Sequence, residues 1–294
     1  MKPCAEDRLL KRLLRLVPVP TNQPLGPGDD CAALLAPGKN KLLLLKTDCI
    51  AEDVHFLRSH DPARVAWKAL CRPLSDIAAM GGIPGEALVT FFSPPDVSED
   101  YWLKFYRGLG RAARRFGVSI AGGEMSRQKQ GIAVSIALTG SIDKENLLRR
   151  SGGKSGDAIF VTGVLGGTLS KHHLDFVPRL AEGRWLAENI HPTAMMDLSD
   201  GLATDLPRLA RASGCGFEIN LDQIPQRRGA SLQQALADGE DYELLFTLSP
   251  KKIPSLLKQW RQVFPKTRLT PIGTLTSRPT TPANWPQGWD HFES

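Results

Sequence analysis

The sequence lacks most of the features that mark secreted, membrane or metal-thiolate proteins. Its 294 residues include five cysteines, an odd number, and none of them forms a CxxC pair. A disulfide framework or a zinc-thiolate site is therefore not expected, and a reducing cytoplasm is the simpler location. The longest compact apolar run, residues 42–45, is far shorter than the roughly 20 residues that a membrane helix needs. We therefore expect no membrane partner.

Common phosphate-binding and nucleophile motifs are missing as well. The segment RSGGKSGD contains GKS, but Leu148 stands where the pattern GxxxxGK[ST] requires its first glycine. The pattern GxGxxG fails around Gly26 and Gly28, and GxSxG does not occur. Any ATP site is therefore expected to use neither a Walker loop nor a dinucleotide-binding fold, and nothing marks a nucleophilic serine or cysteine.

The composition is that of a globular protein, with 41% hydrophobic residues, 23% charged residues and a net charge of +6. A basic balance suits nucleic acid, but it equally suits nucleotides and phosphorylated metabolites. No basic run is interleaved with aromatic residues, so nucleic acid is not an expected partner. The length fits one large domain or two of ordinary size.

Helix and strand signals alternate in both halves of the chain, which predicts an α/β fold with layers in each half. Asp61 and Pro62 are typical of an N-cap and a first helical residue, and Pro73 should kink the helix that follows them. Helices are expected over residues 5–17, 61–80, 98–116, up to about 190, after 201 and from 251. Strands are expected over residues 41–50, 86–92, 118–123, 131–142, 158–163, 194–200, 216–221, 242–248 and 268–273.

Acidic residues recur beside glycine or small polar residues, mostly where predicted strands end. They are Asp29 and Asp30 in GPGDD, Asp48 in KTD, Asp76 in LSDIAAMGG, Glu124 in AGGE, Asp197 and Asp200 in DLSDG, and Glu240 and Asp241 in GED. Carboxylates at strand ends converge at the sheet edge where α/β proteins bind ligands. Two like charges 4 Å apart cost about 4 kcal/mol at an effective dielectric of 20. Magnesium removes that cost and commonly bridges carboxylates to phosphates.

Each motif also has a plain structural explanation. Asp29 and Asp30 could be ordinary turn residues, and the DLSDG segment could simply cap the helix that follows it. Asp76 could be a solvated residue on its helix. His55, in AEDVHF, is a lone histidine of the kind that is usually structural or on the surface. The joint occurrence of these motifs with glycines favours a shared site.

Together, these motifs resemble those of the thiamine-monophosphate kinase family, within the aminoimidazole ribonucleotide synthetase superfamily. The resemblance runs from about residue 7 to the C-terminus, and the combination of LSDIAAMG, DLSDGL and GEDYELLF is specific. It implies ATP-dependent phosphorylation of thiamine monophosphate to thiamine diphosphate. The similar segments follow the family's order: GPGDDCAALL, KTDCIAEDVHF, AWKALCRPLSDIAAMGGIP, AGGEMSR, RSGGKSGDAIFVTG, DLSDGLATDL, GEDYELLFTL and GWDHF.

The resemblance also implies a domain plan and a set of site residues. Residues 1–145 would bind ATP and Mg²⁺ and form a homodimer through their sheet, and residues 146–294 would complete the nucleotide and substrate cleft. The metal positions are Asp30, Thr47, Asp48, Asp76, Glu124, Asp197 and Asp200. The nucleotide positions are Tyr106, Gly123, Arg150 and Ser199. The acceptor positions are His55, Glu240 and Trp289, and Trp289 is expected to stack on the thiamine rings.

Three residues depart from the family pattern. Lys46 replaces the usual serine or threonine, Pro73 the usual asparagine, and Glu124 the usual aspartate. Lys46 and Asp48 are two apart on a predicted strand and so face the same side. An ammonium group there could stand where a metal ion would otherwise sit, and the longer Glu124 could reach it or bind a metal through water. We therefore expect at least one fewer Mg²⁺ than in aspartate-bearing relatives.

The implied mechanism is direct in-line transfer without a general base, because the second pKa of the acceptor phosphate is near 6 and its oxygen is largely ionised at neutral pH. Selenophosphate synthetase and aminoimidazole ribonucleotide synthetase are the alternatives within the superfamily. The first usually has a reactive cysteine or selenocysteine followed closely by lysine, whereas Cys4 is followed by Ala-Glu-Asp. A non-catalytic nucleotide-binding relative is the alternative of another class.

Overall fold

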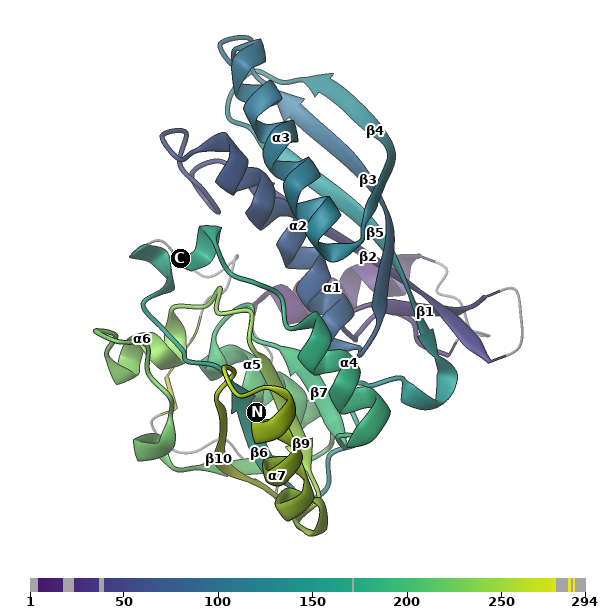
Figure 1. The fold of residues 1–294 in the computed structure, drawn as a ribbon, viewed down its shortest axis with the longest axis vertical. Helices are drawn as coiled ribbons and strands as arrows, with labels where there is room; N and C mark the ends of the chain where they lie inside the picture. The colour runs from purple at the N-terminus through teal and green to yellow at the C-terminus, as the bar shows by residue number, and fades with distance from the viewer. Residues whose placement is uncertain are drawn as a thin grey trace.

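The computed structural model describes residues 5–17, 24–36, 40–170, 172–278, 285, 286 and 288. Each half of the chain forms one five-stranded sheet (Figure 1). In the first sheet the strand order is β1-β2-β5-β3-β4, and every neighbouring pair is antiparallel except β3 and β4. Its strands are β1 Ala32–Leu35, β2 Lys41–Ala51, β3 Ile83–Ser93, β4 Ser119–Arg127 and β5 Ala133–Asp143.

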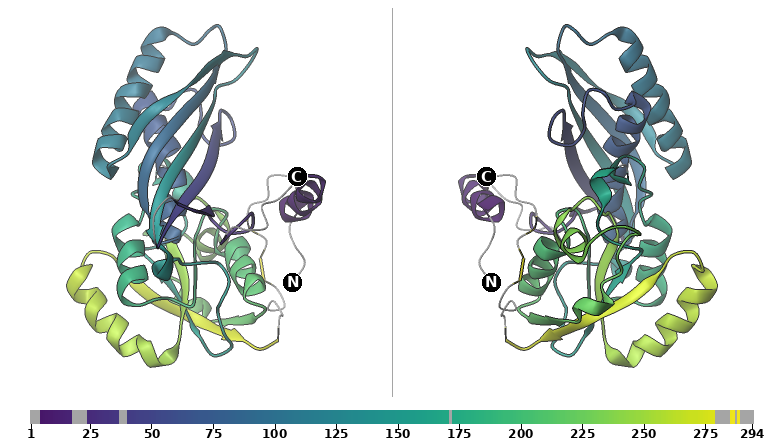
Figure 2. Two further views of the ribbon diagram at one scale, coloured as in Figure 1. Left: turned by 90° about the vertical axis from the view of Figure 1, so that its right-hand side faces the viewer. Right: turned by 90° about the vertical axis from the view of Figure 1, so that its left-hand side faces the viewer.

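Two long helices, α2 (Pro62–Ala79) and α3 (Glu99–Phe116), cover one face of this sheet, as the side views in Figure 2 show. The side chain of Asp61 accepts a hydrogen bond from the backbone nitrogen of Ala63 and caps α2, as predicted. Alternate side chains of β2 pack beneath the helices in one hydrophobic core. None of the described helices covers the opposite face.

The second sheet has the order β7-β9-β6-β10-β8, and all of its neighbouring strands are antiparallel. Helix α5 (Leu202–Ala212) packs on one face, while α4 (Leu180–Asn189) and α7 (Ile253–Val263) pack on the other. The short helices α1 (Ala5–Leu13) and α6 (Leu232–Ala237) complete the described helices. The strands are β6 Ala158–Thr162, β7 Ala194–Asp197, β8 Gly216–Ile219, β9 Leu244–Leu248 and β10 Leu269–Thr276.

Helix α2 is the element that joins the two halves. It packs against β2 and β5 on one side and against α4 and β7 on the other. Gly183 of α4 approaches the backbone of α2 so closely that a Cβ atom at this position would lie 2.1 Å from the carbonyl oxygen of Ala78. Polar side chains on α2 can therefore reach the junction from within the fold.

The predicted α/β class is confirmed, and the expected strands and long helices are present within a few residues of their predicted bounds. Strand β1 was not predicted, because its four residues follow a Gly/Pro/Asp segment that is typical of a loop. Pro73 lies inside α2, which continues to Ala79. The division between residues 145 and 146 falls in the connection from β5 to β6 and stays a prediction. In the described part of the chain, every helix is too short or too polar to cross a membrane.

Candidate active site

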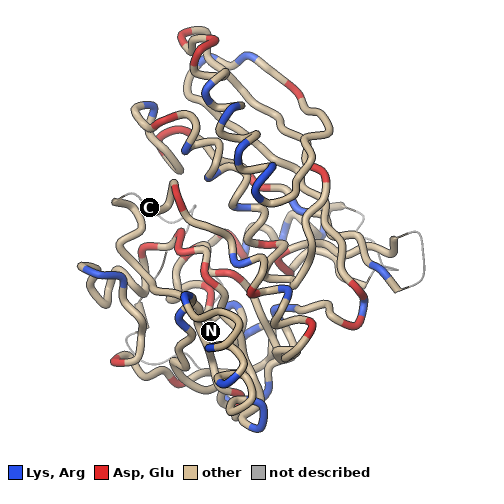
Figure 3. Tube along the Cα trace, in the orientation of Figure 1, with Lys and Arg blue, Asp and Glu red and all other residues tan. Residues whose placement is uncertain are grey.

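Three buried aspartates meet where the two halves of the chain join. Asp30 precedes β1, Asp76 lies on α2, and Asp197 is the last residue of β7. One carboxylate oxygen from each lies within 4.8 Å of the others. Figure 3 shows acidic residues gathered at this junction. The carboxylates were expected at the edge of a single sheet; they converge instead from a loop, a helix interior and a strand end in two domains.

Two basic side chains partly compensate the negative charge of the aspartates. Lys46 Nζ lies 2.7 Å from Oδ1 of Asp76, and Arg150 Nε lies 3.1 Å from Oδ1 of Asp30. The other oxygen of Asp30, Oδ2, is buried without a hydrogen-bond partner among the described residues. A buried carboxylate oxygen without a partner is costly unless a cation binds it. The aspartate cluster therefore fits a divalent cation with oxygen ligands.

The pKa values of the aspartates point the same way. Burial, together with the charge of Asp30, raises the pKa of Asp197 to about 6, although Ser75 Oγ donates a hydrogen bond of 2.6 Å to its carboxylate. Burial also raises the pKa of Asp76, and the charge of Lys46 only partly opposes this. The ionised cluster therefore needs more positive charge than the protein itself supplies.

The metal positions predicted on β2 divide between the two faces of the sheet. Asp48 shares the helix-covered face with Lys46, and its Oδ1 lies 3.0 Å from Arg72 Nη2. The side chain of Thr47 lies on the open face, where its hydroxyl is 3.4 Å from that of Ser135. The structure therefore brings Asp48 towards the aspartate cluster but does not bring the Thr47 side chain there.

Asp200 lies beside the cluster rather than in it. Its carboxylate pairs with Arg208 of α5, and its backbone nitrogen donates a 2.9 Å hydrogen bond to Asp205. Arg208 also pairs with Asp7 of α1, which connects the N-terminal helix to this part of the site. Burial and the charge of Asp200 raise the pKa of Asp205 to about 8. The carboxylate of Asp200 is thus paired with the guanidinium group of Arg208.

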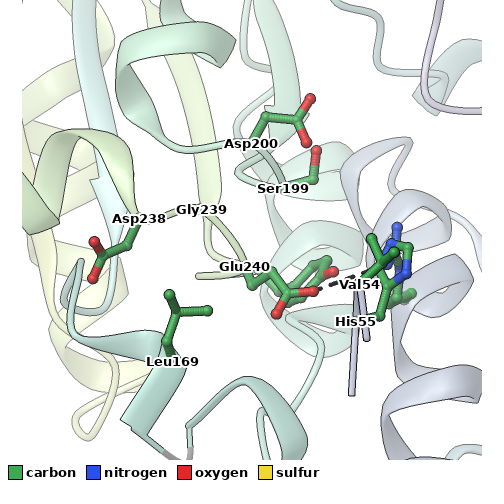
Figure 4. Close-up of a pocket in the computed structure, with 10 residues that line it drawn as sticks. Val54, His55, Leu169, Ser199, Asp200, Asp238, Gly239 and Glu240 are labelled. Atoms are coloured by element: carbon green, nitrogen blue, oxygen red, sulfur yellow. Dashed lines mark ion pairs between the residues drawn. The ribbon is translucent and has the colours of Figure 1, made fainter. Parts of the chain in front are cut away.

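A pocket between the two domains brings together two of the predicted acceptor residues. His55, from the turn after β2, faces Ser199, Asp200 and Glu240 of the second domain. Figure 4 shows Glu240 pointing towards His55 and Val54. Ser199 and Asp200 of the pocket directly follow the strand that ends at Asp197, so an acceptor bound there would lie beside the aspartate cluster. The third predicted acceptor residue, Trp289, lies outside the described residues.

Two basic residues of α2 that sequence reasoning missed support the pocket. Lys68 Nζ lies 2.6 Å from Oε1 of Glu240, and Arg72 Nη1 lies 3.9 Å from the same oxygen. Burial alone would raise the pKa of Glu240, but its contacts with His173, Lys68 and Arg72 outweigh this and lower the pKa to about 2. Glu240 is therefore ionised throughout the physiological range, with its charge compensated by Lys68 and Arg72.

The remaining predicted residues lie in a second groove, on the first domain. Tyr106 of α3 lines it with Gly123 and Glu124 of β4. Position 123 requires glycine, because a Cβ atom there would lie 1.9 Å from the carbonyl oxygen of Val89. Within a single chain, the predicted nucleotide residues therefore lie in three different places. Tyr106 and Gly123 lie in this groove, Arg150 contacts Asp30, and Ser199 lines the acceptor pocket.

Within a single chain Glu124 does not contact Lys46, which was one of the two alternatives for its longer side chain. Glu124 lies on β4, which is three strands away from β2 in the sheet, and it is the β-ladder partner of Thr90 on β3. Its Oε1 accepts a 2.9 Å hydrogen bond from the backbone nitrogen of Met125. Glu124 is exposed on the edge strand, whereas Lys46 points towards α2. The extra methylene of glutamate is far too short to cross three strands, which are spaced about 4.8 Å apart.

Comparison with known proteins agrees with the two-domain arrangement. Residues 28–142 match the family described as AIR synthase related protein, N-terminal domain, and residues 166–280 match its C-terminal domain. The chain is 32% identical to the thiamine-monophosphate kinase of Aquifex aeolicus over 299 residues, covering 90% of this chain and 92% of that relative. The chain belongs to the thiamine-monophosphate kinase family. It is also 35% identical to the thiamine-monophosphate kinase of Rhodopirellula baltica, covering 78% of this chain and 77% of the relative.

Solved structures of the family have the same fold. The structure of AaThiL complexed with AMPPCP and TMP matches with a TM-score of 0.77 and 30% identity, over 98% of this chain and 96% of that one. The thiamine-monophosphate kinase from Stenotrophomonas maltophilia K279a matches with a TM-score of 0.76 and 28% identity, over 95% of both chains. The predicted family is therefore confirmed.

Proposed function

We propose that this protein transfers the γ-phosphoryl group of ATP to the phosphate of thiamine monophosphate, forming thiamine diphosphate and ADP in the cytoplasm. The observation that carries the proposal is the position of the acceptor pocket, lined by His55 and Glu240, beside the cluster of Asp30, Asp76 and Asp197. Membership of the family and similarity to a structure complexed with AMPPCP and TMP support the choice of donor and acceptor.

We infer direct in-line transfer. The acceptor oxygen belongs to a phosphate that is largely ionised at neutral pH, so no side chain has to remove a proton from it. Asp30, Asp76 and Asp197 would hold Mg²⁺, which supplies positive charge against the phosphate oxygens when it is bound. The protein's own contribution is to align donor and acceptor: the pocket lined by His55 and Glu240 receives the thiamine ring, and Arg150 offers a fixed guanidinium beside Asp30.

The test is an assay of purified protein with ATP, Mg²⁺ and thiamine monophosphate. ADP and thiamine diphosphate should form in equal amounts. EDTA should stop the reaction, excess Mg²⁺ should restore it, and unphosphorylated thiamine should give no product because it lacks the ionised phosphate. ATP binding without turnover would favour the non-catalytic relative. Hydrolysis of ATP without thiamine diphosphate would contradict the proposed acceptor.

We also infer that two copies pair through the open face of the first sheet. The side chains of Thr47 and Glu124 lie on that face, in neighbouring rows of the β2-β5-β3-β4 pairing. Exposed apolar side chains surround them: Leu45 is 38% exposed, Leu88 51% and Phe92 37%. A cluster of this kind on an uncovered sheet face is typical of a protein interface.

Replacing Leu88 by arginine is expected to convert the dimer into a monomer and to lower turnover at least about tenfold, because a charge would be buried at the centre of the interface. Molar mass from light scattering and steady-state rates would measure both effects. Leu221→Arg is the matched control, since Leu221 is 44% exposed in the second domain. A wild-type protein that is active as a monomer would contradict the inferred pairing.

A further inference from the structure

Lys68 is a fully buried lysine at the junction of the two domains, with 0% of its surface exposed. Its Nζ lies 2.6 Å from the carbonyl oxygen of His55, 2.6 Å from Oε1 of Glu240 and 2.9 Å from Nδ1 of His173. An ammonium group has three donors and no acceptor, and the carbonyl oxygen of His55 and the two carboxylate oxygens of Glu240 supply three acceptors for them.

The three partners come from three separate segments around the acceptor pocket. His55 belongs to the turn after β2, His173 to the short helix His172–Leu174, and Glu240 to the loop before β9. His55 and Glu240 line the pocket from opposite domains. The buried side chain of Lys68 therefore connects residues on both sides of the pocket.

The loop that carries Glu240 has an unusual backbone that needs such support. Glu240 has a φ of 55° and Tyr242 a φ of 52°, a left-handed conformation that residues other than glycine rarely adopt. A conformation of this kind persists only where the surrounding contacts hold it. Lys68 and His173 contact the carboxylate of Glu240 directly, and Arg72 approaches it to 3.9 Å.

Lys68 is also rigidly connected to the aspartate cluster. Lys68, Arg72, Ser75 and Asp76 are spaced i, i+4, i+7 and i+8 along α2, so they share one face of the helix. Eight residues of helix span about 12 Å. Helix α2 therefore sets the separation between Lys68, next to the acceptor pocket, and Asp76 of the aspartate cluster. Because both residues lie on one helix, backbone flexibility changes this separation little.

We propose that Lys68 is a positioning residue for the acceptor: it fixes Glu240 and the His55 turn in the arrangement that binds thiamine monophosphate. The proposal rests on the proposed kinase function. Removing one partner of a buried ion pair leaves the other charge uncompensated and destabilises the fold, so the melting temperature of each variant is measured beside its acceptor affinity. Lys68→Met keeps most of the volume and removes the three hydrogen bonds.

The experiment measures binding of thiamine monophosphate by calorimetry and the Michaelis constants for both substrates. Lys68→Met is expected to weaken acceptor binding by about tenfold or more, while the Michaelis constant for ATP stays within about twofold. In the double variant Lys68→Met with Glu240→Gln, the loss should be close to that of Glu240→Gln alone, because Lys68 acts through that carboxylate.

Arg179→Met is the matched control. The side chain of Arg179 is 24% exposed, its Nη2 lies 2.5 Å from Oε1 of the buried Glu243, and neither residue lines the acceptor pocket. The variant should lower the melting temperature and leave acceptor affinity unchanged. Equal weakening of both substrates by Lys68→Met, unchanged acceptor binding, or strict additivity with Glu240→Gln would each overturn the proposal while the kinase function stands. A wild-type protein that does not bind thiamine monophosphate would overturn both.

Discussion

Replacing Asp76 by asparagine is expected to lower turnover by at least about a hundredfold while the protein stays folded. Asp76 lies within 4.8 Å of carboxylate oxygens of Asp30 and Asp197 and 2.7 Å from Lys46 Nζ. Asparagine has the same shape but no charge, so the variant loses one of the three carboxylates proposed to hold Mg²⁺ and leaves Lys46 without its nearest counter-charge. Steady-state rates at saturating ATP and thiamine monophosphate measure the effect.

Two further measurements separate a lost ligand from a lost fold. Circular dichroism should give the wild-type spectrum, and Mg²⁺ should no longer raise the melting temperature, because ligand-linked stabilisation requires an intact site. Asp96→Asn is the matched control: the side chain of Asp96 is 72% exposed and makes a 3.3 Å contact with Arg58. A folded Asp76→Asn variant with near-normal turnover would show that Asp76 is not part of the metal site.

Much of the secondary structure could be predicted because its signals are local. Asp61 caps α2 and Ser98 caps α3 through their own side chains, and Gly117 ends α3 with a φ of 69°. A run of apolar residues predicts strands such as β2. Strand β1 has only four residues and is defined by its hairpin pairing with β2, which its own short apolar run does not reveal.

The site was predictable in its residue types but not in its geometry. Asp30, Asp76 and Asp197 were identified from motifs, yet their convergence depends on how α2 packs between two domains. Lys68 and Arg72 were missed because a basic residue on a helix is usually exposed. The available signal was their i, i+4 spacing on the same face as Asp76, in a helix whose other residues are mostly apolar.

Replacing Lys46 by threonine is expected to change how many divalent ions the site holds. Burial opposes the charged form of Lys46, but the charges of Asp76 and Asp48 outweigh it and raise the pKa above its ordinary value. Lys46 therefore brings one permanent positive charge to the aspartate cluster. Two unit charges about 4 Å apart interact by about 4 kcal/mol at an effective dielectric of 20, so the loss of this charge is large.

Lys46→Thr should lower turnover at limiting Mg²⁺ by at least about tenfold and recover at higher Mg²⁺, because Asp76 Oδ1 becomes free to bind a metal. Metal analysis of the AMPPCP complex should give one more Mg²⁺ per chain than in the wild type. Lys46→Met removes the same charge without adding an oxygen ligand, so it should recover less. A metal content and Mg²⁺ dependence that are unchanged in both variants would show that Lys46 does not take the place of an ion.

The double variant Lys46→Thr with Glu124→Asp tests whether Lys46 and Glu124 act independently. Within one chain Glu124 lies three strands from β2 and faces the open side of the sheet, whereas Lys46 faces α2. Independent sites add within about 0.5 kcal/mol, so the double variant should lose the sum of the two single losses. A recovery of activity in the double variant would contradict this independence.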